Sequence, residues 1–271
     1  MLRKYRKENH SEFNYEEYVQ RQCKILNEMS GTLDDYDCSI CRNKGDIYFV
    51  TENNEICRRP CACRAIRESA ARIRKSGLQR LINQYTMDSF RAETALQKEM
   101  KSCAQRFLKN SDGQWFFAGG QSGAGKSHIC TAVSGELLRY GIAVRYMLWK
   151  DESTRIKAVI NDEAEYGRLI GPLKAVPVLY IDDLFKPVLD EFGRRKQPNP
   201  GDIQLAFEII NARYIAGLVT IVSSEWTIEE LQQIDPAIGG RIFQMAKDYC
   251  LSISLGKEKN YRLKGSGRNG N

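Results

Sequence analysis

Residues 115–134 read WFFAGGQSGAGKSHICTAVS. The spacing G-x-x-x-x-G-K-[ST] of a phosphate-binding loop is fitted here by Gly120, Gly125, Lys126 and Ser127. A short pattern of this kind also occurs by chance in flexible loops. Here an apolar strand precedes the pattern and an amphipathic helix follows it, which is the context of a true nucleotide site. The stretch therefore predicts that the chain binds a nucleotide.

Each residue type in this loop has a chemical reason. Backbone N–H groups must turn inward to wrap a triphosphate, and glycines permit the dihedral angles that this requires. We expect Lys126 to bridge the β- and γ-phosphates and the Ser127 hydroxyl to ligate Mg²⁺. The predicted ATP-binding residues are Gly120, Gln121, Ser122, Gly123, Ala124, Gly125, Lys126, Ser127 and His128.

An apolar segment that ends in two acids supplies the other half of such a site. Residues 176–183 read VPVLYIDD. We expect Asp182 to hold Mg²⁺ and Asp183 to orient or deprotonate the attacking water. The alternative is a polar strand end at the rim of a sheet, although two adjacent acids repel each other unless a cation or partner joins them. The next apolar strand ends at Ser224, which is expected to sense the γ-phosphate.

Apolar strands alternate with helical segments through this part of the chain. One long helix is expected over residues 150–169, and strands are expected near 115–118, 141–149, 176–183, 219–224 and 249–255. Such alternation predicts an α/β fold with a parallel sheet flanked by helices.

The composition is that of a soluble globular protein, with 42% apolar and 28% charged residues in a chain of 271. Apolar runs stay well short of the about 20 residues that span a membrane. The charged N-terminus is not followed by the apolar segment of a signal peptide. We therefore expect a cytoplasmic protein without a membrane partner, whose nine cysteines are thiols, metal ligands or core residues.

Two groups of cysteines flank a predicted hairpin. Cys38 and Cys41 precede it, and Cys57, Cys61 and Cys63 follow it. Four thiolates brought together in this way close a tetrahedron around Zn²⁺, as in a zinc ribbon. We assign the second pair to Cys61 and Cys63. Cys57 with Cys61 is the alternative, with a spacing closer to the usual ribbon, and scattered core cysteines are the plain explanation. A closed four-thiolate site stabilises a fold and performs no chemistry.

Positive charge is concentrated beside these cysteines. The chain carries a net charge of +7, and residues 58–80 alone hold eight arginines and lysines against one acid. Such a stripe suits phosphate backbones, but a solvated helix face or a surface that meets an acidic protein has the same composition. We place a domain boundary near 78–84, which gives a zinc module over 1–80 and an ATPase domain with a basic tail over 81–271.

Several segments together resemble the AAA+ ATPases of the DnaC/DnaI-type replicative helicase loaders, in the versions found in phages and Gram-positive bacteria. The segments are Gly120–Ser127, Tyr180–Leu184, Val222–Glu225, Ile238–Ile242, the cysteine cluster that runs into Arg64–Arg67, Lys75–Leu78 and Tyr85–Phe90. The resemblance covers roughly residues 35–265. It implies an AAA+ P-loop core that self-associates and touches single-stranded DNA, and an N-terminal zinc module that grips a hexameric helicase.

The resemblance also implies roles for two arginines. Arg241 matches the arginine that reaches a neighbouring subunit's nucleotide, and Arg262 matches a second sensor arginine, although an ordinary surface arginine explains either one. Two departures from the family pattern predict slow hydrolysis. Asp183 stands where AAA+ enzymes usually carry Glu, and Ser224 and Glu225 stand where many carry Asn.

Aromatic and basic residues follow the second strand, where related loaders hold DNA: Tyr146, Trp149, Lys150, Arg155 and Lys157. Bases stack on aromatic rings while cations follow phosphates. Core packing is the alternative for the two aromatic residues.

The sequence thus predicts a slow ATPase that loads a hexameric replicative helicase onto single-stranded DNA in a bacterial or phage-infected cell. A transposition helper ATPase shares the same core, although the cysteine cluster disfavours it. A zinc-dependent DNA or protein adapter that holds ATP as a static ligand is the third alternative. A small-molecule kinase is the weakest, because no substrate pocket is evident.

Overall fold

The computed structural model describes residues 14–33, 37–75, 78–254 and 256. The chain divides into two compact units, residues 1–68 and 69–271. The division falls inside helix α2 (Cys63–Lys75), and the boundary that the sequence predicted lies at the following helix, α3 (Leu78–Gln84).

The N-terminal unit contains helix α1 (Tyr15–Glu28) and an antiparallel hairpin of β1 (Asp46–Val50) and β2 (Ile56–Pro60). The Asn27 side chain, near the end of α1, accepts from the Tyr48 N–H at 3.0 Å and donates to the Tyr48 carbonyl at 2.8 Å. These two bonds satisfy backbone groups on the outer edge of β1 that the hairpin leaves unpaired. Helix α1 is thereby fixed along the edge of the hairpin.

The C-terminal unit is organised around a five-stranded parallel sheet with the strand order β4-β5-β6-β3-β7. The strands are β3 (Trp115–Gly120), β4 (Val144–Leu148), β5 (Val178–Leu184), β6 (Val219–Ser224) and β7 (Cys250–Ile253). The predicted parallel sheet is confirmed. Because β6 lies between β3 and β5, the loop after β3 and the acidic end of β5 meet at the carboxyl edge of the sheet, where ligands bind in such folds.

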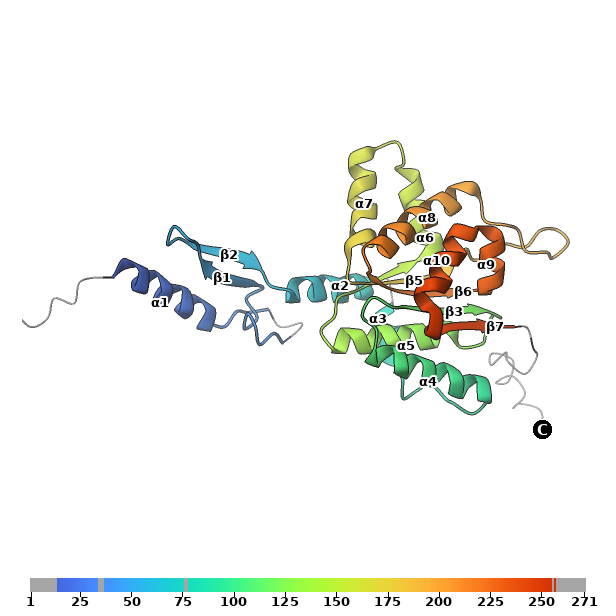
Figure 1. Ribbon diagram of the computed structural model, residues 1–271, viewed down its shortest axis with the longest axis horizontal. Coiled ribbons are helices and arrows are strands. Elements are labelled where there is room, and N and C mark those ends of the chain that lie inside the picture. The colour runs from blue at the N-terminus through green and yellow to red at the C-terminus, as the bar shows by residue number, and fades with distance from the viewer. Residues whose placement is uncertain (1–13, 34–36, 76–77, 255, 257–271) are drawn as a thin grey trace, which may run out of the picture. The chain divides into compact units, whose positions relative to one another are not determined.

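Helices cover both faces of the sheet (Figure 1). Alternate residues of β3 point to opposite faces. Phe116 and Ala118 pack with α4 and α5, whereas Trp115 and Phe117 pack with the helices of the other face. The helices are α4 (Ala95–Lys109), α5 (Lys126–Arg139), α6 (Trp149–Ala158), α7 (Glu163–Ala175), α8 (Pro200–Ile215), α9 (Ile228–Ile234) and α10 (Pro236–Ala246).

The single helix predicted over residues 150–169 is wrong, because the structure has α6 and α7 there. The Asp162 side chain accepts from the Glu165 N–H at 3.0 Å and begins α7 as its N-cap. A side-chain oxygen that bonds to the first turn stabilises a new helix start, and that local bond favours two helices over one.

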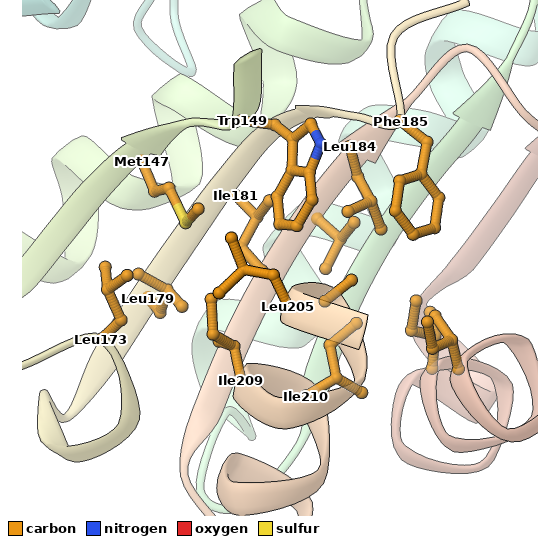
Figure 2. Packing of buried hydrophobic residues seen from close by; sticks show 14 of the residues in the cluster. Met147, Trp149, Leu173, Leu179, Ile181, Leu184, Phe185, Leu205, Ile209 and Ile210 are labelled. Atoms are coloured by element: carbon orange, nitrogen blue, oxygen red, sulfur yellow. The ribbon is translucent and has the colours of Figure 1, made fainter. Parts of the chain in front are cut away.

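A buried core fixes the ends of β4 and β5. Figure 2 shows Trp149 and Phe185 beside side chains of the sheet and of α8, among them Leu205. The Trp149 and Phe185 rings lie 5.4 Å apart at 82°, an edge-to-face contact.

Among the described residues, none of the helices combines the length and the apolar character that a bilayer crossing requires.

Candidate nucleotide-binding site and thiol cluster

The phosphate loop, residues 120–127, joins β3 to α5. Gly120, Gly123 and Gly125 have φ of 102°, 79° and 90°, in the left-handed region that favours glycine. A Cβ at Gly120 would lie only 2.0 Å from the carbonyl oxygen of Ile253, at the end of β7. Glycine is therefore required at position 120 both by its dihedral angle and by the close approach of the neighbouring strand.

Lys126 is held against the loop that it belongs to. Its side chain is only 6% exposed, and Nζ donates to the carbonyls of Gly120 at 2.9 Å and Gln121 at 2.7 Å. The Gln121 amide in turn donates to the Gly256 carbonyl at 2.9 Å and accepts from the Gly256 N–H at 2.6 Å. The ammonium group thus lies among oxygen acceptors that a phosphate is able to replace.

Asp182, near the end of β5, accepts hydrogen bonds from four hydroxyl groups. Ser127, Tyr180 and Ser223 donate to Oδ1 at 3.2, 2.8 and 2.5 Å. Tyr146 donates to Oδ2 at 3.0 Å. The structure therefore brings together the two residues that the sequence assigned to Mg²⁺, Ser127 and Asp182, and adds three hydroxyl donors that sequence analysis did not assign to them.

Both tyrosines of this cluster remain protonated donors at neutral pH. Burial, followed by the charge of Asp182, raises the pKa of Tyr180 well above its usual value. The same two causes raise the pKa of Tyr146. Their hydroxyl groups therefore orient the carboxylate without competing with it for a proton.

Asp183 has a left-handed backbone with φ of 56°. Its N–H donates to the Ser223 hydroxyl at 3.0 Å. Its carboxylate accepts from Lys186 Nζ at 2.7 Å, and that hydrogen bond raises the pKa of Lys186. The predicted water-activating acid is thus oriented from one side by a serine and occupied from the other by a lysine.

Ser224 lies elsewhere than at this cluster. Its hydroxyl is fully buried, donates to the Leu184 carbonyl at 2.8 Å and accepts from the Trp226 N–H at 3.1 Å. Neighbouring residues of a strand point to opposite faces, and Ser223 shares the face of α5 with Ile221. Once the structure shows which face of β6 meets α5, alternation along the strand selects Ser223, the residue that bonds to Asp182.

His128 joins α5 to residues 85–90. Its ring stacks on Tyr85 at 4.6 Å and meets the edge of Phe90 at 5.0 Å. Its Nε2 lies 3.3 Å from the Thr86 carbonyl. Burial lowers the pKa of His128. The residue thus fixes the segment before α4 beside the phosphate loop.

The two predicted arginines are placed differently. The Arg241 side chain, on α10, donates to the Ala237 carbonyl at 3.0 Å, and its guanidinium lies 5.1 and 5.5 Å from the ring centres of Phe207 and Tyr214 on α8. Arg241 therefore packs against its own unit in this chain. Arg262 lies outside the described residues.

A pocket of about 610 Å³ opens between α6 and the loop over residues 185–199, and we call it the lysine pocket. Its walls include Lys150, Thr154, Lys157, Lys186, Lys196 and Asn199. Trp149 is only 3% exposed and packs in the core, and Tyr146 bonds to Asp182. Trp149 also contributes to the pocket wall but is packed as the core alternative predicted, and the half-buried Tyr146 ring lies edge-to-face with Tyr180.

Four cysteines of the N-terminal unit form the thiol cluster, which consists of Cys38, Cys41, Cys61 and Cys63. All four are buried, and their sulfur atoms lie within 4.8 Å of one another. The distances are 3.8 Å from Cys38 to Cys61 and 3.4 Å from Cys41 to Cys63. Tetrahedral Zn²⁺ with bonds of about 2.3 Å separates its sulfurs by roughly 3.8 Å, so the cluster fits such an ion.

Backbone geometry supports this cluster. The Gly45 N–H donates to the Cys41 sulfur at 3.3 Å, from a turn in which Gly45 has φ of 81°. Burial raises the pKa of Cys41, but the Gly45 N–H and the neighbouring thiols outweigh it and lower the pKa to about 6. Cys57 lies on β2, paired with Phe49, and is not part of the cluster. The structure thus gathers Cys61 and Cys63, the pair that the sequence favoured.

Comparison with known proteins gives the family. The model of the IstB-like ATP binding proteins matches residues 42–268. The chain belongs to this family. It is 32% identical to the phage-like element PBSX protein XkdC of Bacillus subtilis over 242 residues, 85% of this chain and 87% of XkdC. It is 27% identical to the replicative helicase loader DnaC of Escherichia coli K12 over 113 residues, 41% of this chain and 46% of DnaC.

A solved structure agrees on the fold. The crystal structure of the DnaC helicase loader superposes with a TM-score of 0.52 and 17% identity, over 64% of this chain and 97% of that one. The predicted AAA+ P-loop core and the resemblance to DnaC/DnaI-type loaders are confirmed. This member of the IstB-like ATP-binding family thus also carries a buried thiol cluster in its N-terminal unit.

Proposed function

We propose that this IstB-like protein is a slow ATPase that loads a hexameric replicative helicase onto single-stranded DNA. The observation that carries the proposal is the convergence of Lys126, Ser127 and Asp182 at the carboxyl edge of the sheet, where Ser127 and Asp182 are already hydrogen-bonded at 3.2 Å. Homology to DnaC supports the helicase and DNA partners.

The catalytic work is divided among residues of one sheet edge. Lys126 exchanges its carbonyl acceptors for phosphate oxygens, and Ser127 and Asp182 hold Mg²⁺. When held there, Mg²⁺ would neutralise charge that develops on the phosphates. Asp183 orients or deprotonates water once Lys186 no longer occupies it. The shorter acid and the Lys186 contact both favour a low rate of hydrolysis.

The other assigned residues serve assembly. We propose that Arg241 leaves its aromatic neighbours on α8 to reach the nucleotide of an adjacent copy, with Arg262 as a second sensor. The thiol cluster binds Zn²⁺ and shapes the N-terminal unit as the helicase-binding module. DNA follows the lysine pocket, where Lys150 and Lys157 supply charge. We place the protein in the cytoplasm, where such partners are found.

A transposition helper ATPase is the second candidate, and the family match to IstB-like proteins favours it. A static ATP-bound adapter is the third, supported by the lysine that occupies Asp183. The three candidate functions differ in whether ATP is hydrolysed and in which macromolecule the protein binds. Hydrolysis excludes the adapter, and the identity of the captured partner separates the first two.

The test is co-purification of the tagged protein with a purified hexameric helicase, or with a transposase, with and without ATP. We expect ATP-dependent capture of the helicase and slow phosphate release when single-stranded DNA is present. Lys126→Ala is expected to abolish nucleotide binding and loading. Lys98→Ala, an exposed lysine of α4, is the matched control. Normal helicase loading by a Lys126→Ala protein that binds no ATP would refute the proposal.

A further inference from the structure

Lys186 belongs to two sites at once. Its Nζ lies 2.7 Å from Oδ2 of Asp183, and its side chain, 49% exposed, also lines the lysine pocket. The contact with Asp183 is the ion pair that ties the end of β5 to the loop beyond it. A ligand that enters the pocket therefore meets a cation that is already bonded to the proposed catalytic acid.

The lysine pocket carries uncompensated positive charge. Four lysines and one acid, Asp202, line the pocket. Asp202 forms an ion pair with Lys157 at 2.5 Å. Lys150 and Lys196 form no ion pair with any acid in the described parts of the chain. A multiply charged anion is the ligand that this surplus attracts, since each added phosphate finds another ammonium group.

The walls of the pocket are mixed in character. Val188 is 63% exposed, and it lines the pocket together with Pro187 on the same loop that carries Lys186. Thr154 and Asn199 add neutral hydrogen-bonding groups. Apolar surface between lysines suits the sugars and bases of an unpaired strand, which a free phosphate lacks.

We propose that the lysine pocket binds phosphates of a single-stranded nucleic acid, and that Lys186 exchanges Asp183 for one of these phosphates when the strand binds. The proposal rests on the ATPase function proposed above. Exchange moves one cation between two anions, so no proton is transferred. The hydrogen bond that Lys186 donates to Asp183 raises the pKa of Lys186, so the amine that enters the exchange is charged.

The exchange links DNA to hydrolysis. While Lys186 holds it, the Asp183 carboxylate is neutralised and cannot orient water freely. Once released, Asp183 remains anchored through its N–H to Ser223, next to Asp182. The bound strand thereby completes the water-activating group without any movement of the sheet.

The experiment is a double-mutant cycle that contains no nucleotide. Fluorescence anisotropy measures the affinity of the full-length protein for labelled oligodeoxythymidylate at low, fixed salt. Lys186→Met is expected to weaken binding, and Asp183→Asn is expected to tighten it about two- to fivefold, the range of an exposed ion pair. In the Lys186→Met background Asp183→Asn is expected to change nothing, because the lysine that it would release is absent.

A matched control separates exchange from a general loss of negative charge. Asp190 lies on the same loop and pairs with Arg194 at 2.9 Å. Asp190→Asn is expected to raise the affinity for the oligonucleotide by less than half as much as Asp183→Asn does. Its effect is expected to be the same in the Lys186→Met background. Thermal melting of each variant checks folding, and Lys186→Gln repeats the lysine change with a polar side chain.

Three results would overturn the inference: no binding of the oligonucleotide, equal effects of Asp183→Asn in both backgrounds, or displacement of the strand by poly-glutamate as readily as by unlabelled oligonucleotide. Inorganic phosphate alone is expected to compete only weakly. Because ATP is absent, a protein that never hydrolyses ATP still gives a clear answer here. Failure of the exchange and failure of the proposed ATPase are therefore distinguishable.

Discussion

Replacing Ser223 with alanine perturbs both acids of the site through one hydroxyl group. Ser223 is fully buried, donates to Asp182 at 2.5 Å and accepts from the Asp183 N–H at 3.0 Å. Losing a bond to a carboxylate costs about 2 kcal/mol, and leaving the half-buried Asp183 N–H without a partner adds a cost at the lower end of about 1–3 kcal/mol. Since the two losses overlap, we expect Ser223→Ala to lower the free energy of unfolding by about 3 kcal/mol.

Ser224→Ala is the matched control, because this neighbour is equally buried but bonds only to the Leu184 carbonyl and the Trp226 N–H. The bond to a neutral carbonyl is worth about 1 kcal/mol and the Trp226 N–H is also left unpaired, so with the same overlap we expect a smaller loss of about 2 kcal/mol. Urea denaturation at an unchanged m-value measures both. ATP hydrolysis is expected to fall further in Ser223→Ala than in Ser224→Ala, because only Ser223 contacts the acids.

Equal destabilisation by the two variants, or a loss below about 1 kcal/mol in Ser223→Ala, would refute this reasoning. Either result would mean that the hydroxyl cluster around Asp182 contributes little. A larger fall in ATP hydrolysis in Ser224→Ala than in Ser223→Ala would favour the sensor role predicted for Ser224.

Three further outcomes are expected. Gly120→Ala, whose Cβ would lie 2.0 Å from a backbone carbonyl, should destabilise the fold by more than about 3 kcal/mol and abolish ATP binding in calorimetry, whereas Gly171→Ala, with no atom within 4 Å of its Cβ, should be tolerated. Cys61→Ser should lose zinc by metal analysis while Cys57→Ser keeps it, since only Cys61 belongs to the cluster. Burial lowers the pKa of His128 below its usual 6.5, so the unfolded chain binds more protons there. Stability should therefore fall as pH drops through and below that value, and His128→Asn should flatten this dependence in thermal melts from pH 8 to 5.

Features set by local sequence were predictable. The phosphate loop depends on glycines and a lysine within a few residues of one another, and its strand and helix flanks are equally local. The acidic end of β5 is visible because an apolar run stops at Asp182. A cluster of cysteines was also predictable, since a hairpin brings its two ends together, but the hairpin alone does not choose Cys61 and Cys63 over Cys57 and Cys61.

Features set by long-range contacts were not predictable in this way. Ser224 was preferred to Ser223 because the sequence alone does not say which face of β6 meets the phosphate loop. An aromatic residue beside lysines, such as Trp149, is typical of a site where bases stack, but in the structure Trp149 packs edge-to-face with Phe185 in the core. Lys186 contacts Asp183 from only three residues away, and Asp183 has a left-handed backbone that the sequence analysis did not predict.

Two hydrogen bonds between the Gln121 side chain and the Gly256 backbone connect the phosphate loop to the residues that follow β7. Because the Gln121 side-chain amide both donates and accepts, separating the two residues would break two hydrogen bonds at once. The same glutamine offers its backbone carbonyl to Lys126, so its side chain and its main chain connect the end of the sheet to the phosphate-binding lysine. Displacing Gly256 would therefore shift the Gln121 carbonyl, and with it the position of the Lys126 ammonium group in the phosphate loop.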